Sequence, residues 1–269
     1  MDKNISILGC GWLGFPLAIQ LVASGWRVKG STTTIDKINL LSANEIDPYL
    51  VHLQEIKDSD TNLFLNSETL LFNVPPSLKK RSETEYLEQV ANLVNFARSS
   101  PIKKVIFISS TSVYPELNKP IIDTDDVDEN TVVFKSEKLF TQCSSFKTTV
   151  IRFAGLIGPG RHPSRFFAGK KNIPNGKAPV NLIHLDDCIA VIKTVLNAEL
   201  TAPIYHAAAP SHPTRAAFYT AAAQQAGLPL PEFIDELAGW KMIDSVQLEK
   251  DLGYRFIYPD LIDSLNHWK

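Results

Sequence analysis

Apolar residues in roughly the first 150 positions alternate between two kinds of spacing. Short apolar runs of strand length occur at residues 5–8, 26–31, 49–53, 69–74, 104–109 and 148–153. Segments with apolar residues three and four positions apart separate them, at residues 15–24, 82–98 and 132–143. In the segment 82–98, the positions at helical spacing are Tyr86, Val90, Leu93, Val94 and Ala97. Strands that alternate with helices predict an α/β fold with a doubly wound parallel sheet, covered by helices on both faces.

The pattern changes after about residue 157. Residues 158–179 are rich in glycine, proline and basic residues, which predicts loops. Helices are predicted again at residues 185–198, 216–227 and 245–252, with a short strand at 204–206. We therefore expect a first domain at residues 1–156 and a small C-terminal substrate-binding lobe at 157–269, too discontinuous to fold alone. Residues 185–206 are expected to return to the core of the first domain.

A glycine-rich turn joins the first predicted strand to the first predicted helix. It reads Gly9-Cys10-Gly11-Trp12-Leu13-Gly14, which matches G-x-G-x-x-G. In this context Gly9 permits a tight turn, Gly11 lets the backbone approach a diphosphate, and Gly14 allows close packing of helix on strand. The helix N-terminus adds N–H groups and a favourable dipole for phosphates. The sequence thus predicts a Rossmann-type dinucleotide-binding domain.

The end of the second predicted strand bears on the choice of cofactor. NAD-binding sites usually carry a carboxylate there, which accepts hydrogen bonds from the ribose hydroxyls. Here the chain has the hydroxyl-bearing Ser31, Thr32 and Thr33, and no carboxylate before Asp36. These hydroxyls, with the charge of Lys37, suit a 2′-phosphate. We expect NADP, with NAD as the alternative because no arginine stands at the usual place.

Composition excludes several other classes of protein. The formal net charge of −2 creates no field that would attract nucleic acid or an anionic membrane. The chain has no apolar run of about 18 residues and no secretory pattern at its N-terminus, so we expect a cytoplasmic protein. Its three cysteines, Cys10, Cys143 and Cys188, suggest neither disulfides nor a zinc site. The carboxylate-rich residues 123–129 match no calcium loop, and no metal is expected.

Three further motifs complete the picture. The fifth predicted strand runs into Ser109-Ser110-Thr111-Ser112-Val113-Tyr114; Gly158-Pro159-Gly160-Arg161 follows the sixth strand; and Asn181-Leu182-Ile183-His184-Leu185-Asp186-Asp187 opens a later helix. With the glycine turn, the first and the third of these motifs resemble the extended short-chain dehydrogenase/reductases, the NAD(P)-dependent epimerase/dehydratase group. The likeness is greatest to the atypical YeeZ-like branch, whose features include the glycine turn itself, Gly30-Ser31-Thr32-Thr33, Gly158-Pro159-Gly160-Arg161 and the tail segments Leu252-Gly253-Tyr254 and Tyr258-Pro259.

The resemblance implies an oxidoreductase or epimerase acting on a small polar or sugar-like hydroxyl or carbonyl compound. Besides the glycines, it places Trp12, Leu13 and Pro75 beside the cofactor. The family's catalysis uses a serine or threonine after the fifth strand and a Tyr-x-x-x-Lys pair on the next helix. Ser110 takes the place of the serine, with Thr111 as its neighbour if the register slips, and Lys138 takes the place of the lysine.

Phe134 stands where the resemblance expects the catalytic tyrosine, and none of the seven tyrosines has a lysine four residues later. A phenyl ring cannot exchange a proton, although it can pack against substrate or nicotinamide. Tyr114 is the first candidate for proton transfer and His162 the second. Alternatively the reaction needs no strong acid, or the chain is a catalytically silent sensor of NADP(H). A lyase or isomerase with tightly held NAD is a further, less favoured possibility.

The predicted loop after the sixth strand carries Arg161, His162 and Arg165. Two guanidinium groups beside an imidazole suit a carboxylate or phosphate on a substrate, and a solvated basic loop is the alternative. His184, followed by Asp186 and Asp187, is predicted to cap a helix. By analogy with relatives, the helices at 82–98 and 132–143 are expected to form the face of a homodimer.

Overall fold

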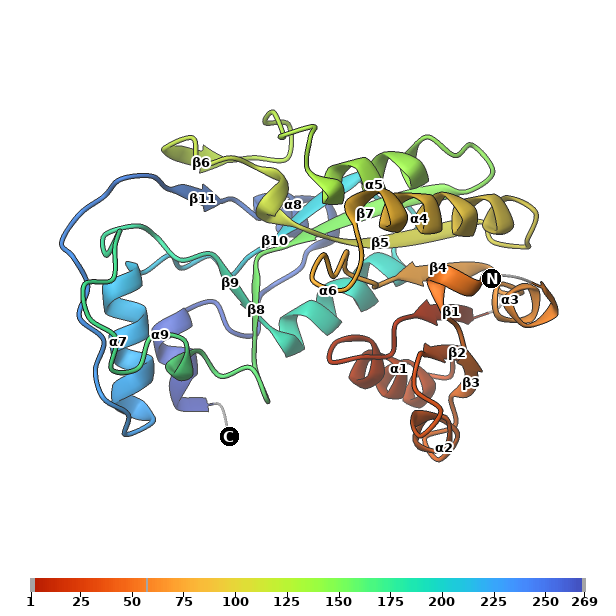
Figure 1. Ribbon diagram of the computed structural model, residues 1–269, viewed down its shortest axis with the longest axis horizontal. Helices are drawn as coiled ribbons and strands as arrows, with labels where there is room; N and C mark the ends of the chain where they lie inside the picture. The colour runs from red at the N-terminus through yellow and green to blue at the C-terminus, as the bar shows by residue number, and fades with distance from the viewer. Residues whose placement is uncertain (1–2, 57, 268–269) are drawn as a thin grey trace. The chain divides into compact units, whose positions relative to one another are not determined.

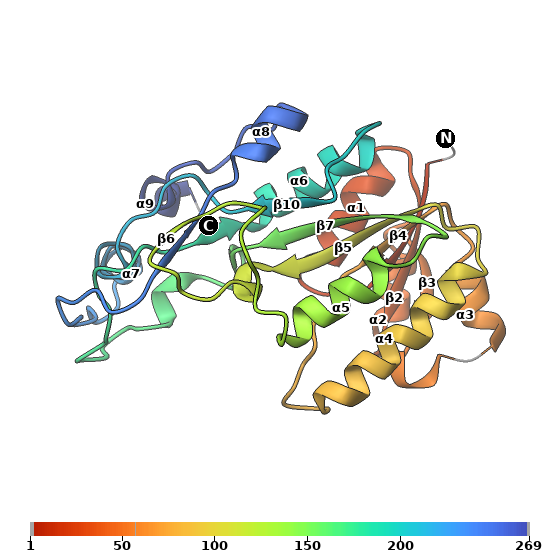
Figure 2. The same ribbon diagram turned by 90° about the horizontal axis from the view of Figure 1, so that it is seen from above.

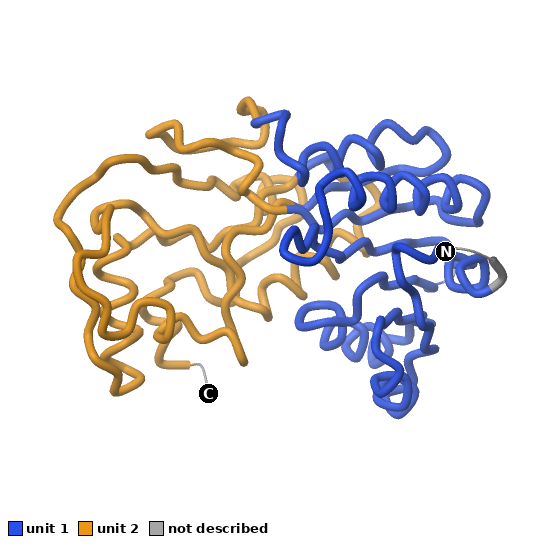
Figure 3. Tube along the Cα trace, viewed as in Figure 1, with its two compact units in different colours: residues 1–109, 128–151, 202–204 blue, residues 110–127, 152–201, 205–269 orange. Residues whose placement is uncertain are grey.

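The computed structural model describes residues 3–56 and 58–267, which form two compact units (Figure 3). Unit 1 contains the described residues within Met1–Ser109, Asp128–Ile151 and Ala202–Ile204. Unit 2 contains those within Ser110–Val127, Arg152–Thr201 and Tyr205–Lys269. Each unit is therefore assembled from segments that are distant in the sequence.

A seven-stranded sheet has the strand order β10-β7-β5-β4-β1-β2-β3 (Figure 1). Its strands are β1 (Asn4–Leu8), β2 (Arg27–Thr32), β3 (Asp47–Leu50), β4 (Thr69–Phe72), β5 (Lys104–Ser110), β7 (Lys147–Phe153) and β10 (Ile204–Ala207). Strand β1 pairs in parallel with both β2 and β4, and the β2–β3 and β4–β5 pairs are parallel too. The strand order reverses between β1 and β4, which is where open α/β sheets bind ligands. The predicted Rossmann-type, doubly wound parallel sheet is confirmed.

The helices of unit 1 cover both faces of its part of the sheet. They are α1 (Gly14–Ala23), α2 (Lys37–Ser42), α3 (Asp58–Phe64), α4 (Glu83–Arg98) and α5 (Val132–Thr141), with a short 3-10 helix, η1, at Leu53–Glu55. Figure 2 shows α1 on the face opposite α4 and α5. The buried residues of α4 are the five predicted from their spacing, which confirms that helix and its inner face. Between the sheet and these helices, the rings of Phe72 and Phe107 stack at 5.1 Å, and Phe140 of α5 lies 5.0 Å from Phe72.

Unit 2 contains two short parallel strand pairs and its own buried cluster. The pairs are β6 (Lys119–Ile121) with β11 (Lys241–Ile243), and β8 (Gly155–Ile157) with β9 (Leu182–His184). Its helices are α6 (Leu185–Asn197), α7 (Arg215–Gln225), α8 (Val246–Leu252) and α9 (Leu261–Ser264), and its 3-10 helices are η2 (Thr111–Val113), η3 (Pro163–Arg165) and η4 (Leu265–His267). Phe218, Ala222 and Leu261 are fully buried at the centre of an apolar cluster. This cluster gives the C-terminal half a hydrophobic core that its sequence pattern did not predict.

Several predicted boundaries shift in the structure. The strand expected at residues 49–53 lies at Asp47–Leu50, because β3 pairs with Lys29–Thr32 of β2 and ends where β2 ends. The strand expected at 69–74 ends at Phe72, and the next residue turns toward the glycine loop. Helices α2 and α3 and the four short strands of unit 2 were not predicted, since segments this short carry little periodicity. Residues 158–179 form loops with one 3-10 helix, as expected.

Two findings on the described residues bear on function. None of the described helices combines the length and the apolarity that crossing a membrane requires. Within residues 3–56 and 58–267, no group of three or more His, Cys, Asp or Glu side chains is arranged to hold a metal ion.

Candidate functional site

The glycine turn follows β1 and opens α1, at the point where the strand order reverses. Gly9 has a φ of 105°, a conformation that favours glycine. A Cβ on Gly9 would lie 2.6 Å from the carbonyl oxygen of Asn73, and one on Gly14 would lie 2.2 Å from the carbonyl oxygen of Gly9. A Cβ on Gly11, by contrast, would meet no atom within 4 Å from any described residue other than its two neighbours in sequence. The first and third glycines are therefore required by packing inside unit 1, whereas the second leaves open space above the backbone.

The electrostatics of this turn suit an anion. Helix α1 has no acidic residue in its first turn, so its positive N-terminal end is not offset by a carboxylate. Burial raises the pKa of the Cys10 thiol to about 12, which keeps it neutral. The side chain of Leu13 is buried in the core, so only its backbone can reach a ligand, whereas Trp12 is half-buried. An open glycine at the N-terminus of a helix fits the diphosphate of a dinucleotide.

Two side chains from neighbouring segments bind the backbone of Gly9. Its N–H donates to the hydroxyl of Ser31 at 2.9 Å, and its carbonyl accepts a hydrogen bond from the side-chain amide of Asn73 at 3.1 Å. The N–H of Cys10 also donates to the backbone carbonyl of Ser31 at 2.9 Å. Sequence reasoning identified Ser31 but missed Asn73, whose signal is a polar side chain directly after the apolar strand Thr69–Phe72.

The three hydroxyl residues at the end of β2 differ in their surroundings. Ser31 is 2% exposed and its oxygen is bound to Gly9. Thr32 is also buried, and its oxygen accepts a hydrogen bond from the N–H of Thr34 at 3.1 Å. Thr33 is exposed, as is Lys37 at the first residue of α2. Of the predicted phosphate-binding groups, Thr33 and Lys37 are thus the ones open to solvent.

The loop after β4 is tied to helix α4. The guanidinium of Arg81 donates to the backbone carbonyls of Pro75, at 3.0 Å, and Pro76, at 2.8 Å. It lies over the ring of Tyr86 at 4.5 Å, and the hydroxyl of Tyr86 donates to the carbonyl of Val74 at 2.9 Å. These bonds hold the backbone at the exposed Pro75 in place.

Helix α5 brings together the two residues aligned with the family's catalytic pair. The ammonium of Lys138 lies 5.5 Å from the centre of the Phe134 ring, one helical turn away. The same ammonium is 3.8 Å from the carboxylate of Glu129; Lys138 is half-buried and Glu129 is exposed. The pair therefore offers a cation and an aromatic face, with no ionisable hydroxyl at position 134.

A buried carboxyl group next to this pair was not predicted. Glu137, 2% exposed, accepts a hydrogen bond of 2.5 Å from the hydroxyl of Ser109 at the end of β5. In unit 2, the hydroxyl of the following residue, Ser110, accepts from the N–H of Ser112 at 3.1 Å and so caps η2. The hydroxyl of Ser110 remains half-buried rather than buried, so it can still reach a ligand.

Tyr114 lies in a buried polar network within unit 2. It is 2% exposed, its hydroxyl lies 2.7 Å from Nε2 of His206, and it accepts a hydrogen bond from the guanidinium of Arg152. Nδ1 of His206 lies 3.0 Å from the carbonyl of Asp244, so Nδ1 carries the proton and the tyrosine donates to Nε2. Burial lowers the pKa of His206 to about 4, which keeps the imidazole neutral. The structure does not support Tyr114 as the group that exchanges a proton with substrate, because its hydroxyl is buried and bound on both sides.

The basic loop predicted to contact substrate lies in unit 2. Arg161 and Arg165 are exposed, and His162 between them is half-buried. Nδ1 of His162 lies 2.7 Å from the hydroxyl of Ser164, and burial lowers the pKa of His162. Elsewhere in unit 2, a pocket of about 560 Å³ is lined by residues that include His212, Tyr254 and Phe256, and the basic loop does not contribute to its wall.

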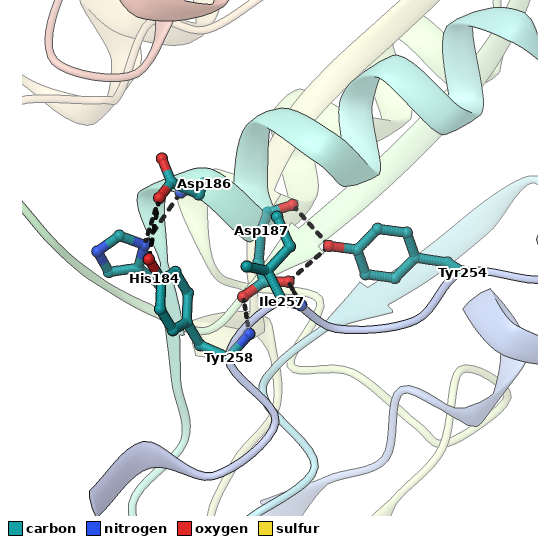
Figure 4. Close-up of polar contacts among 6 residues, drawn as sticks. All are labelled: His184, Asp186, Asp187, Tyr254, Ile257 and Tyr258. Atoms are coloured by element: carbon teal, nitrogen blue, oxygen red, sulfur yellow. Dashed lines mark hydrogen bonds and ion pairs between the residues drawn. The ribbon is translucent and has the colours of Figure 1, made fainter. Parts of the chain in front are cut away.

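The segment from His184 to Asp187 has a structural role (Figure 4). Nδ1 of His184 accepts a hydrogen bond from the N–H of Asp186 at 3.2 Å, which confirms the predicted helix cap. The carboxylate of the fully buried Asp187 accepts from the hydroxyl of Tyr254 at 2.6 Å and from the N–H groups of Ile257, at 2.7 Å, and Tyr258, at 3.1 Å. Burial raises the pKa of Asp187, although these bonds oppose the shift. The first turn of α6 thereby anchors the tail motif of the chain.

Comparison with known proteins gives both a relative and a fold. No protein-family model matches the chain. Protein YeeZ of Escherichia coli strain K12 is 37% identical over 267 residues, which span 96% of this chain and 97% of that protein.

Solved structures with the same fold contain bound nicotinamide dinucleotides. UDP-glucuronic acid 4-epimerase from Bacillus cereus, in complex with NAD, superposes with a TM-score of 0.77 at 16% identity, over 97% of this chain and 94% of that one. The human epimerase family protein SDR39U1, isoform 2, with NADPH superposes with a TM-score of 0.70 at 14% identity, over 98% of each chain. At these identities the likeness is one of fold.

Proposed function

Because this chain belongs to the YeeZ family of extended short-chain dehydrogenase/reductases, we propose that it is an NAD(P)-dependent oxidoreductase or epimerase. The observation that carries the proposal is the open glycine turn: Gly11 faces free space at the N-terminal end of α1, while Gly9 and Gly14 are fixed by contacts below it. Such a turn provides backbone N–H groups to a diphosphate. A nicotinamide dinucleotide, when bound, supplies the hydride chemistry.

NADP(H) is the proposed cofactor in preference to NAD(H). The end of β2 offers the exposed hydroxyl of Thr33 and the exposed ammonium of Lys37, and no carboxylate lies between Gly30 and Asp36. A hydroxyl and a cation stabilise a 2′-phosphate, whereas a carboxylate in their place would repel it. The 2′-hydroxyl that NAD(H) carries in place of this phosphate would be stabilised less by Thr33 and Lys37.

We assign four tasks to single residues, the first two in unit 1 and the other two in unit 2. The ammonium of Lys138 holds the ribose next to the nicotinamide, and the ring of Phe134, which that ammonium faces, packs against nicotinamide or substrate. The hydroxyl of Ser110 orients the substrate oxygen. The exposed Arg161 and Arg165 bind an anionic group on a small polar or sugar-like substrate.

Proton transfer needs a different residue from the one the family uses. Phe134 has no ionisable group, and Tyr114 is buried and hydrogen-bonded within unit 2. His162 is half-buried with a lowered pKa, so it is neutral at pH 7 and able to accept a proton. It is therefore our first candidate for the general base.

A second function is sensing of NADP(H) without turnover. It is favoured by the phenylalanine at position 134 and by the burial of the Tyr114 hydroxyl. A protein that lacks an accessible phenol at the catalytic position loses about 10²–10⁴-fold in rate for the family's standard reaction. It would nonetheless retain its cofactor site, because that site depends on the glycine turn and the end of β2.

Titration followed by a substrate screen tests both functions. The purified protein is titrated with NADPH and NADH, and is then incubated with aldehydes, ketones and nucleotide sugars while nicotinamide absorbance and sugar configuration are followed. Tight binding with turnover supports the enzyme, and tight binding without any turnover supports the sensor. No association with either nucleotide would refute both.

Helices α4 and α5 are the proposed homodimer face. They lie side by side in unit 1, linked by the ion pair between Lys135 and Glu83 at 2.8 Å (Figures 1 and 2). Analytical ultracentrifugation checks the proposal, since a monomer at micromolar concentration would contradict it.

A further inference from the structure

We propose that Asn73 and Ser31 are positioning residues that hold the glycine turn in the conformation that a nicotinamide dinucleotide requires. This inference rests on the proposed cofactor site and goes beyond it, since it assigns the two side chains to the turn rather than to the ribose or its phosphate. They act from opposite sides of β1. Ser31 belongs to β2, and Asn73 follows β4.

Both polar backbone groups of Gly9 are bound by these side chains. Its N–H donates to the hydroxyl of Ser31 at 2.9 Å, and its carbonyl accepts from the amide of Asn73 at 3.1 Å. The backbone of Asn73 takes part as well, because its N–H donates to the carbonyl of Leu8 at 3.0 Å. Gly9 therefore has no freedom to rotate either of its peptide groups without losing a hydrogen bond.

The turn needs such bonds because its residues give it little rigidity of their own. Gly9 adopts a φ of 105°, and a glycine can leave such a conformation easily. Rotation of its carbonyl would change the close contact with Gly14, where a Cβ would lie only 2.2 Å from the carbonyl oxygen of Gly9. The amide nitrogen of Asn73 is also 3.2 Å from that Cβ position. Asn73 thus touches both ends of the turn and sets how the end of β1 meets the start of α1.

Because Ser31 is buried, its role in positioning the glycine turn can be distinguished from direct recognition of the ribose. Ser31 is 2% exposed, whereas Thr33, two residues later, is exposed. A side chain that acts through Gly9 affects the diphosphate, which NADPH and NADH share. Removal of such a side chain should weaken the binding of NADPH and of NADH by the same factor. Loss of a direct 2′-phosphate ligand would weaken NADPH alone.

The test measures three dissociation constants in each variant: for NADPH, for NADH, and for adenosine in competition with NADPH. The variants are Asn73→Ala, Asn73→Asp and Ser31→Ala. Asn73→Asp keeps the shape of the side chain but replaces the donor by an acceptor facing a carbonyl oxygen. Asn62→Ala, at an exposed position of α3, is the matched control.

We expect Asn73→Ala and Ser31→Ala to weaken NADPH and NADH equally, by about five- to tenfold, the usual worth of one hydrogen bond. Asn73→Asp should weaken both further. Adenosine, which has no phosphate, should keep its affinity within about twofold, and Asn62→Ala should leave all three affinities unchanged.

Three other results would overturn the inference. Unchanged binding of both dinucleotides in Asn73→Ala would show that the turn needs no clamp. A loss confined to NADPH would make Ser31 a phosphate ligand. If the affinities for NADPH, NADH and adenosine all fell together with the melting temperature, both residues would contribute only to the stability of the fold. If the unmodified protein bound no dinucleotide, the proposed function itself would fail, and the inference with it.

Discussion

The glycine turn of unit 1 and the Tyr114 network of unit 2 are both built from hydrogen-bonded polar groups, but only the turn leaves open space beside its backbone. In the turn, the side chains of Ser31 and Asn73 bind the backbone of Gly9, and the space beside Gly11 remains open. In the network, the hydroxyl of Tyr114 is buried, bound by Arg152 on one side and by His206 on the other. A polar cluster therefore indicates a ligand site only where some of its groups still face open space.

The largest expected effect is the pH dependence of stability caused by His206. Its pKa is lowered to about 4 by burial, from an ordinary value of 6.5. A base with a lowered pKa binds fewer protons in the folded protein than in the unfolded one, so stability is complete above about pH 6.5 and falls as the pH drops toward 4. The loss from this group amounts to about 3 kcal/mol.

Denaturant unfolding at several pH values between 4 and 7 measures this loss. His206→Asn, which keeps a donor near the Nδ1 position, should show a shallower fall than the unmodified protein. His267→Asn, at an exposed position, is the control. An identical fall in His206→Asn would show that the imidazole is not held neutral by the network.

Gly11→Val comes next and probes the open side of the turn. Apart from its two neighbours in sequence, no described residue has an atom within 4 Å of the new Cβ, so the free energy of unfolding should stay within about 0.5 kcal/mol. It occupies the space that the diphosphate needs, and affinity for NADPH should fall at least about 100-fold, equivalent to about 2.7 kcal/mol. Fluorescence titration and thermal melting measure the two effects. Tight NADPH binding by Gly11→Val would place the cofactor elsewhere.

Tyr114→Phe tests the closed network. Removing the hydroxyl leaves Arg152 and His206 without one of their partners in a buried place, which should cost about 1–3 kcal/mol of stability. Dissociation constants for the cofactor should not change. If instead the variant kept its stability but lost turnover by 100-fold or more, the phenol would be the proton donor after all.

Lys37→Ala should give the smallest effect. Lys37 is exposed, and its contact with a 2′-phosphate is screened by solvent, so we expect a three- to tenfold loss of affinity for NADPH. Affinity for NADH should not change, and the ratio of the two constants is the measurement. An equal loss for both cofactors would remove Lys37 from the 2′-phosphate site.

Local sequence signals predicted much of unit 1. The inner face of α4 followed from apolar residues three and four positions apart, and the glycine turn from its place between a strand and a helix. Such features depend on spacing along the chain. Asn73 escaped prediction because its partner, Gly9, is 64 residues earlier, and only the parallel pairing of β1 with β4 brings them together.

The burial of Tyr114 in unit 2 could not be predicted from the sequence. The sequence identified Tyr114 as a candidate acid because it follows a strand that ends near the ligand edge in such folds. Its partners come from β7 and from β10, which lie 38 and 92 residues later. Burial depends on these distant segments, so no local pattern could reveal that the hydroxyl is enclosed.

Residue type and local spacing were enough to predict the alternation of strands and helices, the position of the glycine turn, the hydroxyls after the second strand and the absence of a Tyr-x-x-x-Lys pair. Which of those polar groups remain open to a ligand depends on the folded chain. Thr33 is exposed, while Ser31 and Tyr114 are buried, because strands distant in the sequence pack against them. Hydrogen bonding and burial are set by neighbours in space, and only the folded chain supplies those neighbours.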